Sequence, residues 1–132
     1  MAGMVFEDWL SLAENDLMTA QSMLGTGQGV FLQVGLQCHQ AIESLLTAAC
    51  LKHHISLPAN AEGLLRIVTE LPIKAEMDDQ ALQTLEWLSA YPILESMGVQ
   101  DAGDLAALLT QEKTQELLDR TKELFEWIRS RL

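Results

Sequence analysis

The sequence predicts an all-α protein, an up-and-down bundle of four to five helices that forms one domain over residues 1–132. Aromatic residues make up only 5% of the chain and β-branched residues are sparse, whereas Leu, Ala, Gln and Glu dominate. This composition favours helix over strand. Apolar side chains also recur at spacings of three and four in several segments, and a chain of this length can bury the core of one domain.

The first helix is predicted from about residue 5 to residue 24. Its apolar face consists of side chains three or four positions apart, namely Phe6, Trp9, Leu10, Ala13, Leu17, Ala20 and Leu24. Three glycines within residues 25–29 follow this face and end the helix. A second helix is then expected over residues 30–54.

A short third helix is predicted over residues 61–71. Pro58 and Asn60 mark a turn and a cap before it, and Pro72 ends it because proline cannot continue a helix without losing a backbone hydrogen bond. The inner face of this helix consists of Leu64, Leu65, Val68 and Leu71.

The fourth helix is predicted over residues 78–91. Either Asp78 or Asp79 can cap its start. We expect the helix to stop at Tyr91, because Pro92 follows and the residue before a proline disfavours helical backbone angles.

The segment over residues 92–110 is predicted to be a loop with one turn in the apolar run at residues 105–109. The last helix is expected over residues 110–131. Its apolar face comprises Leu117, Leu124, Phe125, Ile128 and Leu132.

The second predicted helix carries almost no charge, since Glu43 is the only charged residue between Asp16 and Lys52. Its glutamines, histidine and glutamate make membrane insertion too costly. A helix that is apolar on more than half of its circumference must be covered on several sides, and the bundle is expected to cover only part of it. We therefore expect a homodimer whose candidate interface residues are Gln33, Leu36, Gln37, Gln40, Ser44 and Thr47.

His39 and Glu43 are four positions apart and therefore face each other across one helical turn. In a structural interpretation they pair, or Glu43 accepts a hydrogen bond from Trp9 or Tyr91. In a functional interpretation the pair acts as a general acid and base or binds a polar ligand, because burial shifts the pKa values of both groups.

The remaining motifs do not indicate a metal site or a cofactor. Cys50, His53 and His54 have a spacing compatible with zinc, but no second cluster of such residues accompanies them. All three histidines lie in the second helix, which argues against a catalytic triad. We expect neither a metal nor a cofactor.

The charge balance limits the partners that the protein can bind. The chain has 19 acidic and 8 basic residues, which gives a formal net charge of −11. This surface field repels phosphate backbones and anionic membranes, so nucleic acid and membranes are not expected as partners. The N-terminal residues lack the pattern of a secretory signal, which predicts a cytoplasmic location.

Several segments, taken in their order along the chain, resemble the HEPN domain family. The residues that carry the resemblance are the apolar face of the first helix with Asp16, the segment HQAIESLL at residues 39–46, AYP at residues 90–92, and ELFEWIRSRL at residues 123–132. The resemblance implies a helical bundle that often pairs through its central helices. It also implies nucleotide binding, work beside small nucleotidyltransferases or, in some branches, metal-independent RNA cleavage.

The chain departs from the family pattern at its basic and catalytic positions. The branches that cleave RNA use an arginine followed four to six residues later by a histidine, but the last histidine here is His54 and no arginine precedes it. Ser44 and Thr47 stand where lysines are usual, Ala90 stands where an arginine is usual, and Glu62 stands where a histidine is usual. Each change removes attraction for a phosphate.

These observations predict a noncatalytic, homodimerising binding module, with a small nucleotidyltransferase as a candidate protein partner. The residues retained from the family pattern form a candidate polar or ligand-binding cluster, namely Asp16, His39, Gln40, Glu43 and Tyr91, in which Glu43 is expected to be an interior anchor. The alternative is a nucleotide-binding or RNA-processing protein in which His39 and Glu43 act as acid and base, and Lys52 or Arg66 holds a phosphate.

Overall fold

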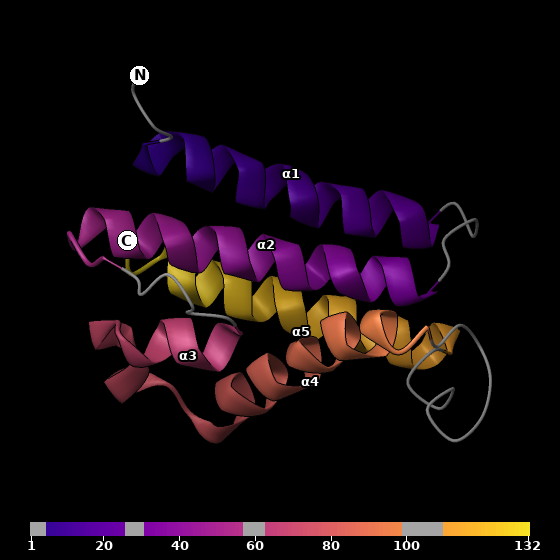
Figure 1. The fold of residues 1–132 in the computed structure, drawn as a ribbon. Coiled ribbons are helices and arrows are strands. Elements are labelled where there is room, and N and C mark those ends of the chain that lie inside the picture. The colour runs from indigo at the N-terminus through magenta and orange to yellow at the C-terminus, as the bar shows by residue number, and fades with distance from the viewer. Residues whose placement is uncertain (1–4, 26–30, 57–62, 99–109) are drawn as a thin grey trace.

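A computed structural model describes residues 5–25, 31–56, 63–98 and 110–132 of the chain, and within these ranges every regular element is a helix (Figure 1). The predicted all-α class is confirmed. The elements are α1 (Phe6–Gly25), α2 (Phe31–Lys52), α3 (Leu64–Thr69), the 3-10 helix η1 (Pro72–Glu76), α4 (Asp79–Ser96) and α5 (Gln111–Arg129).

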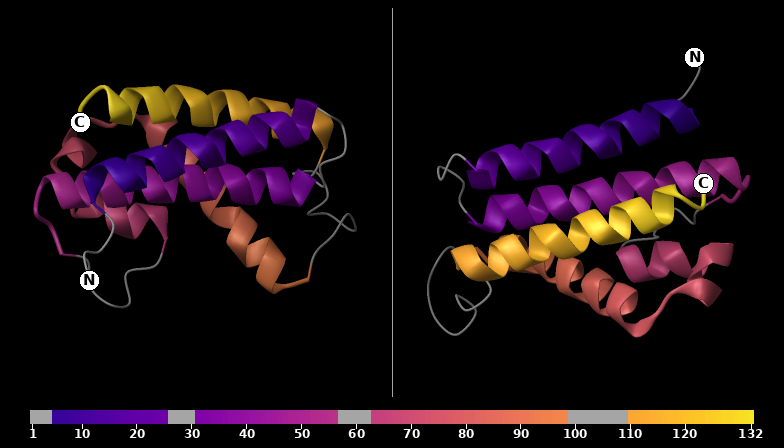
Figure 2. Two further views of the ribbon diagram at one scale, coloured as in Figure 1. Left: turned by 90° about the horizontal axis from the view of Figure 1, so that it is seen from above. Right: turned by 180° about the vertical axis from the view of Figure 1, so that it is seen from behind.

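Helix α2 is the central element, because it contacts α1, α3, α4 and α5. Helices α1, α2 and α5 run alongside one another, and α4 crosses them obliquely (Figures 1 and 2). The apolar faces of these helices meet in one core. Its largest fully buried side chains include Ile42, Leu45 and Leu46 of α2, Leu85, Leu88 and Tyr91 of α4, and Leu117, Phe125 and Ile128 of α5.

Helix α2 ends two residues earlier than predicted. His54 adopts a left-handed backbone conformation with a φ of 56°. The backbone N–H of Ile55 donates to the carbonyl of Cys50 at 2.8 Å, and that of His54 donates to the carbonyl of Leu51 at 3.2 Å. These two bonds form a Schellman motif, which supplies hydrogen-bond donors to carbonyls that would otherwise have none at the end of the helix.

The predicted stop of the fourth helix at Tyr91 is wrong, because α4 continues through Pro92 to Ser96. A proline inside a helix costs about 3 kcal/mol. Tyr91 and Leu94, on either side of Pro92, are both buried in the core. Burying one large apolar side chain contributes about 1.5–3 kcal/mol, so continuing the helix offsets the cost of the proline.

Helix α3 and its surroundings also differ in detail from the prediction. The helix covers only Leu64–Thr69, and Pro72 begins η1. The predicted turn at Pro58, the cap at Asn60, the family position of Glu62 and the turn at residues 105–109 lie outside the described residues.

Candidate functional site

The candidate dimer interface forms a narrow stripe along α2. Gln33 and Gln40 are exposed on this stripe, and Leu36, Gln37 and Thr47 are partly exposed. The apolar side chains on the rest of α2 are mostly buried by the other helices of the same chain. The bundle therefore covers more of α2 than the sequence predicted, and the stripe that it leaves open is mostly polar, with Glu43 as its only charged side chain among the described residues before Lys52.

Ser44, the sixth candidate interface residue, is fully buried within the bundle. It lies on the side of α2 that faces α1. Its hydroxyl donates a hydrogen bond to the Asp16 carboxyl group and accepts one from Gln40 Nε2 at 3.4 Å. Burial raises the pKa of Asp16, and the hydrogen bond from Ser44 partly opposes that rise. Two acceptor atoms here, Asp16 Oδ2 and Gln37 Oε1, are buried without a hydrogen-bond donor among the described residues.

His39 and Glu43 form a weak pair on the other side of the stripe, with His39 Nδ1 3.9 Å from Glu43 Oε2. Burial lowers the pKa of His39 and raises the pKa of Glu43, so burial favours the neutral form of each group. The Glu43 side chain is 38% exposed, so the expectation that it is an interior anchor is wrong. Neither Trp9 nor Tyr91 donates to Glu43 among the described hydrogen bonds.

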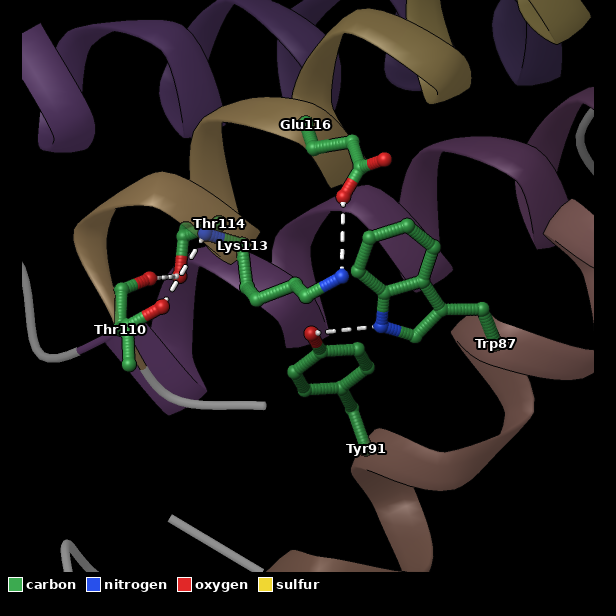
Figure 3. A network of polar contacts seen from close by, with 6 residues as sticks. All are labelled: Trp87, Tyr91, Thr110, Lys113, Thr114 and Glu116. Carbon is green, nitrogen blue, oxygen red and sulfur yellow. Dashed lines mark hydrogen bonds and ion pairs between the residues drawn. The ribbon is translucent and has the colours of Figure 1, made fainter. Parts of the chain in front are cut away.

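Tyr91 lies apart from both groups, in the contact between α4 and α2. Its ring packs directly on Gly35, and its hydroxyl accepts a hydrogen bond from Trp87 Nε1 at 3.2 Å (Figure 3). Burial raises the pKa of Tyr91 to about 12, so the phenol is protonated at neutral pH. Sequence reasoning overlooked Gly35, although a glycine inside a helical pattern indicates a close approach of another element.

The candidate cluster therefore does not converge on one point. Ser44, the contact of Asp16, lies about 140° around α2 from His39, with exposed Gln40 between the two. Tyr91 faces the core and pairs with Trp87. The arrangement contains two small polar groups that flank the stripe on α2, and it does not form a pocket around an acid and a base.

The described residues offer no metal centre, since no group of three or more His, Cys, Asp or Glu side chains is placed to hold an ion. Cys50 is buried, whereas His53 and His54 are exposed. Burial raises the pKa of the Cys38 thiol to about 12, so this thiol is not a nucleophile at neutral pH. None of the described helices combines the length and the apolar run that a bilayer crossing requires.

Two adjoining hollows lie between α4 and α5, with volumes of about 150 Å³ and 250 Å³. Both are lined by Thr84 and Arg120, and neither is lined by a member of the candidate cluster. Trp127 lines the smaller hollow and Trp87 lines the larger one. The sequence alone gives no sign that these two tryptophans share a groove, because that depends on how α4 and α5 are placed relative to each other.

Comparison with known proteins finds a match to the family described as "HEPN domain" over residues 6–131. Two solved structures share the fold. One is the crystal structure of TT1696 from Thermus thermophilus, with a TM-score of 0.78 and 23% sequence identity, over 96% of this chain and 98% of that one. The other is ST0689, described as an archaeal HEPN homologue, with a TM-score of 0.72 and 17% identity, over 98% of each chain. No curated protein matches the sequence.

Proposed function

This chain belongs to the HEPN domain family, and on that premise we propose that it is a single noncatalytic HEPN domain that acts as a homodimerising binding module. The observation that carries the proposal is the solvent-facing stripe of α2. For a chain with 20% charged residues, a stripe with one carboxylate along an entire central helix is unusual. Neutral polar groups suit a surface that becomes hidden yet still forms hydrogen bonds.

The chemistry of the stripe supports a noncatalytic role. His39 is buried, and its partner Glu43 lies 3.9 Å away at the surface. A general acid or base must reach the reacting group at hydrogen-bond distance, but the hollows between α4 and α5 are lined by neither residue. The chain also has no arginine followed four to six residues later by a histidine.

The second part of the proposal concerns the protein partner, for which a small nucleotidyltransferase is the candidate. The support for it is family membership together with an acidic surface, which favours a protein partner over nucleic acid. Co-expression and co-purification with the product of an adjacent nucleotidyltransferase gene test this part separately from dimerisation.

The dimer is tested by light scattering across micromolar protein concentrations at about 0.15 M salt, where the Debye length is about 8 Å. Gln40 lies midway along the stripe between Gln33 and Thr47, so in a dimer whose two-fold axis passes through the middle of the stripe it meets its own copy, and Gln40→Glu places like charges together. We expect the dissociation constant to rise at least about tenfold, which corresponds to about 1.4 kcal/mol.

The matched control is Gln111→Glu, which adds the same charge at an exposed position in the first turn of α5, outside the stripe on α2. It should leave the dimer unchanged. A wild-type protein that is monomeric at all these concentrations would refute the dimer. Cleavage of labelled RNA by the wild type that is lost in His39→Ala would refute the noncatalytic assignment and support the alternative in which His39 and Glu43 are acid and base.

A further inference from the structure

The groove between α4 and α5 contains an arginine without a partner. Arg120 is half-buried and lines both hollows of the groove. Its guanidinium makes no ion pair or hydrogen bond with any other described residue. Glu116, four residues earlier on α5, is at the right spacing to pair with Arg120, but its carboxylate binds Lys113 instead, at 3.3 Å.

The carboxylates that line the groove are each already engaged. Asp78 Oδ1 accepts the backbone N–H of Ala81 at 2.8 Å. Glu123 Oε2 accepts from the side-chain amide of Gln80 at 3.3 Å. Glu116 pairs with Lys113, whose ammonium group also lies 5.8 Å from the centre of the Trp87 ring (Figure 3). Among the charged groups that line the groove, Arg120 is therefore the one whose side chain bonds to none of the described residues, and an anion in the groove would supply its partner.

Apolar side chains line part of the groove beside this guanidinium, among polar and charged ones. Ala81, Leu124 and Trp127 line the smaller hollow, and Trp87 lines the larger one. Both volumes are below the roughly 300–1,000 Å³ that is typical of sites for drug-sized ligands. A ligand that fits is therefore small and carries an apolar body beside its negative charge.

The kind of anion follows from the charges around the groove. Three carboxylates and two cations line the two hollows. A doubly charged phosphate would be repelled by the three carboxylates more strongly than a singly charged group. A guanidinium also matches the planar geometry of a carboxylate with two parallel hydrogen bonds.

We propose that the groove between α4 and α5 is a binding site for a small monocarboxylate with an apolar body, anchored by Arg120 and contacted by Trp87 and Trp127. The site is formed by α4, by α5 and by the residue that caps α4, and it uses no residue of the stripe on α2. A test of this site is therefore independent of a test of the proposed dimer.

The test uses tryptophan fluorescence in a Trp9→Phe background, in which the two remaining tryptophans both line the groove. The probes are 4-methylpentanoate, its neutral amide and inorganic phosphate, each at matched ionic strength. We expect a saturable signal for the carboxylate with a dissociation constant of about 1 mM, as is usual for a ligand of this size. The amide should bind at least about tenfold more weakly, and phosphate should give no saturable change.

The role of the anchor is tested by Arg120→Gln and Arg120→Lys. Arg120→Gln should weaken carboxylate binding at least about tenfold, to the level of the amide. Arg120→Lys should retain part of the affinity, because the charge remains but the paired donors do not. Lys122→Gln is the matched control, since it removes the same charge from an exposed position on the same helix outside the groove, and it should bind like the parent protein.

Three results would overturn the site. One is the absence of a saturable signal for 4-methylpentanoate up to about 50 mM. Another is equal binding of the amide or of phosphate, which would contradict the assignment of the ligand class. The third is unchanged affinity in a folded Arg120→Gln protein, with folding checked by circular dichroism. Because Arg120 has no partner among the described residues, its replacement should leave the fold intact.

Discussion

The contact between Gly35 and Tyr91 determines how closely α4 approaches α2. A Cβ atom placed on Gly35 would lie 2.2 Å from the Cδ1 and Cε1 atoms of the Tyr91 ring. This distance is far inside van der Waals contact, and the ring cannot move aside easily because Tyr91 is fully buried. Gly35 is therefore required for close packing, in a helix whose propensity it otherwise lowers.

Replacing Gly35 by Ala should lower the free energy of unfolding by about 1–3 kcal/mol, because overpacking in the core outweighs the better helix propensity of alanine. Urea denaturation measures the change. Gly25→Ala is the control, since no atom lies within 4 Å of the position that its Cβ would take, and it should leave stability unchanged or slightly higher. A Gly35→Ala protein as stable as the wild type would show that α4 can shift without cost.

The buried imidazole of His39 predicts a dependence of stability on pH. Its pKa in the folded protein lies below the ordinary value of 6.5, because burial disfavours the charged form. As the pH falls below 6.5, the unfolded chain therefore binds a proton that the folded protein does not, and the free energy of unfolding decreases. The decrease continues until the pH reaches the folded pKa, with a slope of at most about 1.4 kcal/mol per pH unit for one proton.

The measurement compares urea unfolding of the wild type and of His39→Gln between about pH 7.5 and pH 5.5, the range that brackets the ordinary histidine pKa. Stability of the wild type should fall more steeply with decreasing pH. Asp16 and Glu43, whose pKa values are raised by burial, act in the opposite direction but are present in both proteins. Parallel curves for the two proteins would show that His39 takes up its proton equally well in both states.

At the scale of the elements, the caps decide where α4 and α5 begin. The sequence left Asp78 and Asp79 as equal candidates for the cap of α4, and the structure places Asp78 in the extended conformation of a cap. Thr110 has the same role at α5, where its hydroxyl accepts the backbone N–H of Lys113 at 3.1 Å. The end of α4 was harder to predict, because burial of the residues around Pro92 overrides the local preference of proline.

Asp78→Ala should lower the free energy of unfolding by about 1 kcal/mol, because it removes the acceptor for the backbone N–H of Ala81. Asp79→Ala is the matched control, since it removes the same charge one residue later and loses only a favourable interaction with the helix dipole, about 0.3–1 kcal/mol. Thermal or urea unfolding distinguishes the two variants. A larger loss for Asp79→Ala would mean that charge, and not the cap, stabilises this end of α4.

At the scale of the whole molecule, the stripe on α2 and the groove between α4 and α5 differ in the charged groups that they carry. The exposed stripe of α2 carries the single carboxylate of Glu43, whereas most of the 19 acidic residues lie elsewhere along the chain. The groove between α4 and α5 instead combines three carboxylates and two cations with two indole rings. Arginine and tryptophan bury large contact areas with strong directional hydrogen bonds, which suits a groove that receives a ligand.

The sequence by itself determined the all-α class, the starts and ends of α1 and α5 to within a few residues, and the uncharged character of α2. These properties follow from local periodicity and composition, which depend only on residues close together in the chain. The HEPN resemblance could also be recognised from short motifs in their order. The sequence could not show which polar side chains form a cluster, because that depends on the rotation of each helix about its own axis.

Only the tertiary structure decided the arrangement of the polar side chains around Gln40. Asp16 accepts a hydrogen bond from Ser44 on one side of Gln40, and His39 and Glu43 lie on the other side. It also decided that Arg120 faces a hollow instead of pairing with Glu116. The physical reason is that side chains distant in sequence meet according to how closely the helices approach, and this distance is set by packing contacts such as the one between Gly35 and Tyr91.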